Sequence, residues 1–387
     1  MKNFEFKNPT RLIFGKGEMS KLSKELPKDA KILMLYGGGS IKKNGVYEQV
    51  KKALEGFEVT EFGGIPVNPE YSVLLDALGV IKENSITFLL AVGGGSVIDG
   101  TKFLSAAANY KGNPWEILKK PVRMYEGDAM PFGTVLTLPA TGSEMNSSYV
   151  ISRKETGEKL SAGGPGMFPV FSILDPEVVR SIPKRQIVNG IADAYMHVME
   201  QYLTYPANAF LQDRFSESIL ITLQELAPKL LNQDFDYDVA GDFMYCCTMA
   251  LNGLIQKGVP TDWAVHSMGH ELTAQFGIDH ARTLAIVAPN HYRYYFENKK
   301  EKLAQYGERV WNLTEGNIEE KAAQAINKLE SFFHSLNIDT KLSQYTANYK
   351  GAAEKVKTAF ENRGWKNMGE RQALMPEDAR KILEMSY

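Results

Sequence analysis

Short apolar runs that end in glycine-rich turns alternate with helical patterns through the first half of the chain, and this alternation limits the possible folds most strongly. The runs at 31–36, 86–92 and 133–138 are almost continuously apolar, whereas 70–84 and 97–109 have helical spacing. Continuous apolar strands are buried on both faces, and strands that alternate with helices form parallel sheets. The first half is therefore predicted to be a parallel, wound α/β sheet.

The pattern changes near residue 180, after which helical periods follow one another with little clustering of β-branched residues. Helices are predicted near 184–204, 208–230, 239–256, 261–275, 299–311 and 318–335. A chain of 387 residues is longer than a single core usually supports. We therefore expect an α/β domain over residues 1–180 and an all-helical domain over 181–387.

Charge and cysteine content exclude several classes of protein. The net charge is −2, so nothing points to nucleic acid or an acidic membrane as a partner. No apolar run approaches the roughly 20 residues of a membrane span, and the N-terminus has no signal-peptide pattern. The two cysteines, Cys246 and Cys247, are adjacent and can build neither a disulfide framework nor a thiolate metal cage. We expect a cytoplasmic protein.

Three polar turns follow the expected strands. Gly-Gly-Gly-Ser occurs at 37–40 and at 93–96, each time between a strand and a predicted helix, and Pro-Ala-Thr-Gly-Ser occurs at 139–143. Glycine leaves no Cβ in the way of a ligand, and a helix N-terminus suits phosphate. Each turn alone is equally well explained as a tight connection, and neither glycine turn is GxGxxG or a Walker loop. Together, at the carboxyl ends of parallel strands, they predict a nucleotide site.

The first turn favours NADP over NAD. It contains no carboxylate to repel a 2′-phosphate, while Ser40 and backbone amides could bind one. Lys42 and Lys43 add positive potential, unless they are simply solvated surface residues. Asp99 follows the second turn and could bind a ligand, cap the helix or serve as a polar core residue.

Three of the six histidines fall within residues 263–280. Asp193 and His197 lie four apart, as do His266 and His270, so each pair shares a helix face. His280 follows beyond the helix break expected at Gly277. Such pairs on facing helices can converge on a divalent metal. A single histidine on an apolar face is more often a hydrogen-bonded core residue. Spacing therefore leaves five candidates for three or four ligand positions.

The remaining histidines and the neighbouring acids receive simpler interpretations. His291 and His334 are expected to be structural. Glu200 and Glu271 could accept hydrogen bonds behind a metal ligand, but we expect them to be surface charges.

Taken together, these stretches resemble the iron-containing (group III) alcohol dehydrogenases, and within them the NADPH-dependent butanol dehydrogenase and aldehyde reductase subgroup. The resemblance runs nearly end to end. The matching stretches are PTRLIFGKG (9–17), YGGGSIKKNGVY (36–47), LLAVGGGSVIDGTKF (89–103), LTLPATGSEMN (136–146), NGIADAYMHVMEQY (189–202), ALNGLIQKGVPTDWAVHSMGHELTAQFGIDHARTLAIVAP (250–289) and ERVWNLTEG (308–316).

The resemblance implies the fold shared with dehydroquinate synthase: an α/β dinucleotide-binding domain and an all-helical metal-binding domain. It implies that Asp193, His197, His266 and His280 bind the metal and that His270 lies near the nicotinamide and substrate. The cofactor-contacting positions that it implies are Gly37, Gly38, Gly39, Ser40, Asn68, Gly94, Gly95, Ser96, Asp99, Thr137, Thr141, Asn146 and Lys159.

The activity implied is hydride transfer between NADP(H) and a small aldehyde or primary alcohol, with Fe²⁺ or Zn²⁺ as Lewis acid on the substrate oxygen. His270 is a candidate proton relay. Trp263 and Phe276 suggest an apolar substrate. Two alternatives remain: a polyol or polyol-phosphate dehydrogenase on the same fold, and a non-catalytic nucleotide- or metal-binding protein. A substrate phosphate would need more basic residues than the stretches around the ligands contain. A homodimer is the family expectation.

Overall fold

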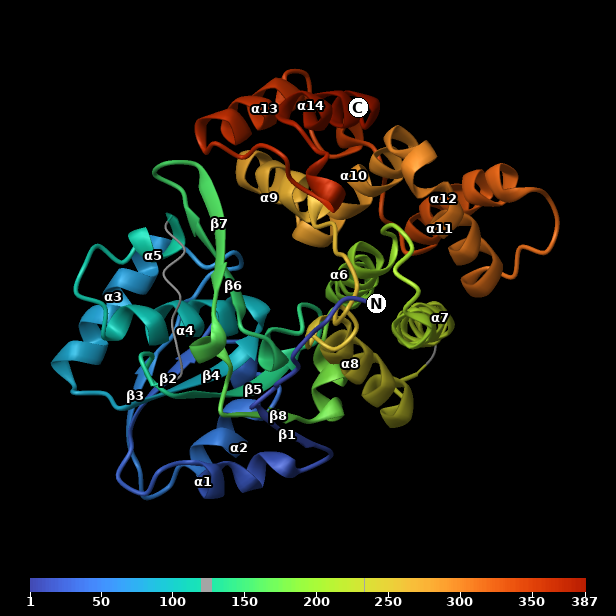
Figure 1. Cartoon of the computed structure of the whole chain (residues 1–387). Coiled ribbons are helices and arrows are strands. Elements are labelled where there is room, and N and C mark those ends of the chain that lie inside the picture. Colours follow the sequence, from blue (N-terminus) through green and yellow to red (C-terminus); the bar gives the residue numbers. More distant parts are fainter. Residues whose placement is uncertain (120–126, 233) are drawn as a thin grey trace. The chain divides into compact units, whose positions relative to one another are not determined.

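The computed structural model describes residues 1–119, 127–232 and 234–387, which form two compact units (Figure 1). The first consists of Lys7–Ile187 and Asn232–Asn252, and contains the large sheet. The second consists of Met1–Phe6, Val188–Leu231 and Gly253–Tyr387, and is helical. Each unit thus collects more than one stretch of chain. The functional division at residue 180 stays a prediction.

The α/β unit is built on a six-stranded sheet in which all neighbouring strands are parallel. The strand order is β1-β8-β5-β4-β2-β3. The strands are β1 (Arg11–Phe14), β2 (Lys31–Tyr36), β3 (Glu58–Phe62), β4 (Phe88–Gly94), β5 (Phe132–Leu138) and β8 (Phe171–Leu174). The three predicted apolar runs are β2, β4 and β5, which lie side by side and are buried. The predicted parallel α/β sheet is confirmed.

Helices lie on both faces of this sheet, as Figure 1 shows. On one face are α1 (Leu22–Glu25) and α2 (Val46–Ala53), and on the other are α3 (Tyr71–Glu83) and α4 (Gly95–Ala108). The unit also contains α5 (Glu116–Lys119) and α8 (Tyr237–Leu251). The small residues of α4, such as Ala106 and Ala107, are fully buried and allow close packing on the sheet.

Two local features of this unit differ from the sequence interpretation. An antiparallel hairpin of β6 (Ser148–Arg153) and β7 (Glu158–Gly163) was not predicted, because its strands lack a clean apolar alternation. The first glycine turn does not lead directly into an α-helix either. A 3₁₀ turn at Ser40–Lys42 follows it, and α2 begins only at Val46.

The helical unit consists of α6 (Lys184–Tyr202), whose first turn belongs to the other unit, α7 (Phe210–Asn232), α9 (Ala264–Phe276), α10 (His280–Tyr294), α11 (Phe296–Val310), α12 (Ile318–Ser335), α13 (Ala352–Asn362) and α14 (Pro376–Met385). The helices predicted in this part of the chain are present. Helix α9 ends at Phe276, and Gly277 follows with φ 67°, which confirms the helix break predicted at this glycine. The prediction omitted α10, α13 and α14, and α10 contains the usual helix breaker Pro289.

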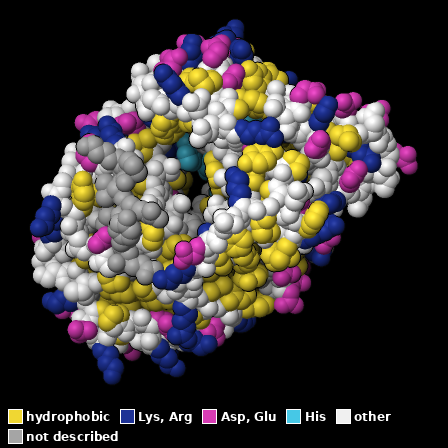
Figure 2. Space-filling view, viewed as in Figure 1, with side chains coloured by type: hydrophobic (Ala, Val, Ile, Leu, Met, Phe, Trp, Pro, Cys, Tyr) yellow, Lys and Arg dark blue, Asp and Glu magenta, His cyan; other side chains and the backbone are white. Residues whose placement is uncertain are grey.

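The surface carries charges of both signs. On the face shown in Figure 2, Lys and Arg side chains are mixed with Asp and Glu side chains. Within the described residues, no helix combines the length and the apolar character needed to cross a bilayer.

Candidate metal centre and nucleotide-binding edge

Helix α6 carries the first pair of candidate metal ligands. Asp193 and His197 lie one turn apart, and their side chains are almost fully buried. The distance from Asp193 Oδ1 to His197 Nε2 is 4.0 Å. The neighbouring Ile191, Ala192 and Ala194 have no exposed surface, so the helix is held from several sides. A packed helix fixes the direction of both polar side chains.

Helices α9 and α10 supply the other candidates. Because Gly277 turns the chain between them, His280 at the start of α10 comes close to His266 of α9, with ring centroids 5.3 Å apart. The rings of His197 and His266 are stacked at 4.7 Å, and His280 Nε2 lies 4.0 Å from Asp193 Oδ1. The ring of His270 lies 4.7 Å from that of His280. The fold thus gathers all five candidates in one place.

The cluster has the properties of a divalent metal site. Ligand atoms of Asp193, His266 and His280 all lie within 4.8 Å of one another. Asp193 Oδ1 is buried and accepts no hydrogen bond from any described residue. Two ligands about 2.1 Å from a tetrahedral ion are roughly 3.4 Å apart, somewhat less than the 4.0 Å from Asp193 Oδ1 to His197 Nε2 and to His280 Nε2. The oxygen and nitrogen donors suit Fe²⁺ or Zn²⁺. Which of the five residues bind the ion stays a prediction.

The expectation that Glu200 and Glu271 are surface charges is wrong. Only 1% of Glu200 is exposed, and its carboxylate contacts His266 Nδ1. Burial, reinforced by the nearby Asp262 carboxylate, raises the pKa of Glu200. Glu271 is also buried and forms an ion pair with Arg363. Helical spacing did place Glu200 near the face of His197, but its partners lie more than 60 residues further along the chain.

His291 and His334 lie in other surroundings. His291 Nε2 is hydrogen-bonded to Asp262 Oδ2 at 3.0 Å, deep in the helical unit. Asp262 also pairs with the Lys299 ammonium at 2.8 Å. Burial acts to raise the pKa of Asp262, but the Lys299 and His291 charges outweigh it and lower that pKa. His334 is hydrogen-bonded to Thr340.

Several predicted cofactor contacts meet at the N-terminus of α4. Strand β4 passes into α4 without a loop, and a Cβ on Gly95 would lie 2.5 Å from Thr141 Oγ1, so the close approach itself requires glycine. The backbone N–H of Asn68 donates to Ser96 Oγ at 3.3 Å, and Lys159 Nζ donates to the side-chain oxygen Asn68 Oδ1 at 2.9 Å. Thr137 lies beside this edge, near the end of β5. The arrangement offers amide groups and one cation at a helix N-terminus.

Behind that edge lies a buried lysine that the sequence interpretation missed. Lys102 is fully buried and donates to Ser143 Oγ, Asn146 Oδ1 and Ser148 O, at 2.7, 3.0 and 2.8 Å. Asp99 accepts from Ser143 Oγ at 2.6 Å and from the Val150 amide at 2.9 Å, so it acts as a polar residue of this network. Burial lowers the pKa of Lys102 to about 8, although the Asp99 and Glu144 charges oppose this shift. The Asp-x-x-Lys spacing in α4 was the available signal.

The first glycine turn is accessible to solvent. Gly38 and Ser40 are exposed, and Gly39 has φ 91°. Lys42 Nζ lies over the rings of Tyr36 and Tyr47, at 5.0 and 4.9 Å from their centroids.

A carboxylate is nevertheless close to this turn, which sequence analysis did not anticipate. Glu61 near the end of β3 accepts from Tyr47 at 2.8 Å and pairs with Lys51 at 3.0 Å. Partial burial acts to raise the pKa of Glu61, but Lys51 and Tyr47 outweigh it, and the pKa is lowered. Glu61 is therefore an ionised group, whose charge Lys51 offsets. The pairing of β3 with β2 brings it there.

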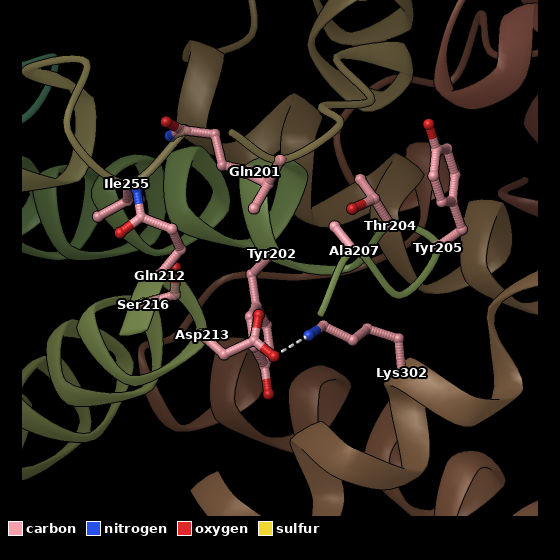
Figure 3. Close-up of a pocket in the computed structure, with 11 residues that line it drawn as sticks. Gln201, Tyr202, Thr204, Tyr205, Ala207, Gln212, Asp213, Ser216, Ile255 and Lys302 are labelled. Carbon is pink, nitrogen blue, oxygen red and sulfur yellow. Dashed lines mark hydrogen bonds and ion pairs between the residues drawn. The ribbon is translucent and has the colours of Figure 1, made fainter. Parts of the chain in front are cut away.

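The helical unit also contains a small pocket that is open to solvent (Figure 3). Tyr202, Asp213 and Lys302 line it, and Asp213 forms a 2.6 Å ion pair with Lys302. Its lining includes none of the predicted metal ligands. The pocket is thus separate from the histidine cluster.

Comparison with known families agrees with this combination of fold and site. Residues 9–176 match the family profile described as iron-containing alcohol dehydrogenase. Residues 187–387 match the profile described as Fe-containing alcohol dehydrogenase family, C-terminal. The chain belongs to the iron-containing alcohol dehydrogenase family.

Individual relatives align over almost the whole chain. It is 48% identical over 386 residues to the NADPH-dependent aldehyde reductase YqhD of Escherichia coli (strain K12), covering 99% of each chain. It is 42% identical over 391 residues to the probable NADH-dependent butanol dehydrogenase 1 of Bacillus subtilis (strain 168), covering 100% of each. The crystal structure of E. coli YqhD matches with a TM-score of 0.97 and 47% identity, covering 100% of this chain and 99% of that one.

Proposed function

We propose that this chain transfers a hydride between NADP(H) and a small aldehyde or primary alcohol of the butanal and butanol kind. The observation that carries the proposal is the buried carboxylate and histidine cluster around Asp193, in a chain of the iron-containing alcohol dehydrogenase family. The 48% identity to an NADPH-dependent aldehyde reductase supports the substrate class.

In this proposal Asp193, His197, His266 and His280 hold one divalent ion, Fe²⁺ or Zn²⁺. The bound ion supplies Lewis acidity toward the oxygen of the aldehyde or alcohol. With one carboxylate among its ligands, the site keeps a net positive charge, which suits an oxygen that gains negative charge. His270, beside His280, holds or passes the proton of that oxygen.

The α/β unit binds NADP(H) in this proposal. Asn68, Ser96 and Lys159 bind phosphate at the N-terminus of α4, while the exposed Gly38 and Ser40 leave room for the 2′-phosphate. Lys42 adds a positive charge near it. Relatives named NADH-dependent butanol dehydrogenases are up to 44% identical, close to the 48% of the NADPH-dependent reductase, so the preference for NADP rests on this turn.

The deciding experiment measures NADPH oxidation with butanal, on chelator-stripped protein and on the same protein given back Zn²⁺ or Fe²⁺. We expect activity to disappear with the metal and to return with one of the two ions. Undiminished activity without metal would refute the role of the ligand cluster. NADPH binding without turnover under any condition would support the non-catalytic alternative.

Three further expectations belong to the proposal. The adjacent cysteines support a cytoplasmic location. The family resemblance supports a homodimer. The proposed division of labour assigns residues 1–180 to the nucleotide and 181–387 to the metal and substrate.

A further inference from the structure

Glu200 of α6 stands behind the candidate metal ligand His266. Its Oε1 accepts from the Val265 amide at 2.7 Å, and its Oε2 accepts from the His266 amide at 3.1 Å and contacts His266 Nδ1. The first amides of a helix have no partner within the helix, and no side chain at the N-cap position caps α9. Glu200 therefore caps α9 from a different helix.

The backbone just before these amides is strained. Trp263 has φ 67°, a conformation that a bulky residue adopts only when its surroundings enforce it. The residue before it is fixed: the Asp262 amide donates to Glu200 O at 2.9 Å, and Asp262 Oδ1 accepts from the Glu370 amide at 3.0 Å. Glu200 thus binds the chain on both sides of Trp263, through its carbonyl oxygen and its carboxylate.

The same carboxylate selects the form of the imidazole. An ionised carboxylate can only accept hydrogen bonds, so Oε2 facing His266 Nδ1 favours the tautomer with the proton on Nδ1 and the lone pair on Nε2. Carboxylates in this position behind a histidine ligand fix its ring orientation and tautomer. The ring itself packs against Trp263, at 5.3 Å between centroids.

We propose that Glu200 is a positioning residue that fixes the orientation and tautomer of His266 and so sets the affinity for the metal. This inference rests on the proposed metal site. It adds that metal affinity requires Glu200 as well as the four proposed ligands.

The test compares Glu200→Gln with Glu217→Gln. Glu217 is an equally buried carboxylate of the helical unit. Its hydrogen-bond and ion-pair partners within the described residues include Tyr202 and Arg309 and none of the candidate ligands. The measurements are the dissociation constant of Zn²⁺, by competition with a chromophoric chelator, and the dissociation constant of NADPH, by fluorescence. We expect Glu200→Gln to weaken Zn²⁺ binding by about 10- to 100-fold with NADPH binding unchanged, and Glu217→Gln to leave Zn²⁺ binding unchanged.

The outcomes distinguish the role of Glu200 from the existence of the metal site. Wild-type Zn²⁺ affinity in a folded Glu200→Gln variant overturns the role of Glu200 and leaves the metal site standing. A wild-type protein that binds no stoichiometric Zn²⁺ or Fe²⁺ overturns both. If Glu200→Gln does not fold, histidine ¹⁵N NMR of the metal-free wild type decides instead. A proton on His266 Nδ1 supports the proposal, and a neutral ring protonated on Nε2 overturns it.

Discussion

Each unit of the molecule contains a buried charged residue that forms hydrogen bonds with segments beside the candidate site. The residue is an anion that accepts in the helical unit and a cation that donates in the α/β unit. In the helical unit the Glu200 carboxylate collects donors from the first turn of α9. In the α/β unit the Lys102 ammonium collects acceptors from the segment after β5. Neither residue is expected to touch the reacting atoms. In both units, buried charges that the motifs did not predict hold the segments that carry predicted site residues.

The largest effect is expected at the ligand cluster itself. Asp193→Asn removes its only carboxylate, and the amide is a poor metal ligand. We expect at least about a 100-fold loss of butanal reduction together with loss of bound metal, while NADPH binding persists. Metal analysis and turnover, measured on the same preparation, check this. Full metal occupancy with full activity would contradict the ligand assignment.

The next change tests the other network. Lys102→Met leaves three acceptors without their donor and Asp99 and Glu144 without a nearby cation. We expect a loss of about 3 kcal/mol in the free energy of unfolding, measured with urea, and at least about tenfold weaker NADPH binding. Zn²⁺ affinity should stay at the wild-type value. If Lys102→Met loses metal binding but keeps NADPH binding, the Lys102 network does not serve the nucleotide site separately from the metal site.

A smaller effect is expected at the first glycine turn. A Cβ on Gly38 would meet no atom within 4 Å, so Gly38→Asp should fold normally. The new carboxylate would repel a 2′-phosphate and could bind ribose hydroxyls instead. We expect KM for NADPH to rise about tenfold and KM for NADH to change less. Equal effects on both cofactors would show that this turn does not select the 2′-phosphate.

The smallest effect is a pH dependence of stability. The pKa of Lys102 is about 8 in the folded protein, against an ordinary value of 10.5. Between these values the unfolded chain binds more protons, so the contribution of Lys102 to stability rises with pH. Relative to Lys102→Met, the wild type should gain about 1 kcal/mol in urea unfolding between pH 8 and about pH 9. A constant difference would mean that Lys102 does not titrate there.

Much of the fold and of the candidate site could be predicted locally. The runs that form β2, β4 and β5 are almost continuously apolar because both faces of the sheet are covered. Each of these strands can therefore be recognised from its own residues. The pair Asp193 and His197 is recognisable because four residues make about one helical turn. The hairpin of β6 and β7 has no comparable apolar pattern, and the internal proline of α10 argued against a helix there.

Local residue patterns are enough to specify the parallel sheet, the helical character of the second half and the types of residue available for a metal and a nucleotide. Which charges are buried depends on the folded chain. Glu200 meets partners 65 and 66 residues away, and Lys102 meets partners 41 to 46 residues away. A local pattern records which face of an element is apolar. It does not record the distant donor or acceptor that makes a buried charge stable, because that partner is supplied only when the chain folds.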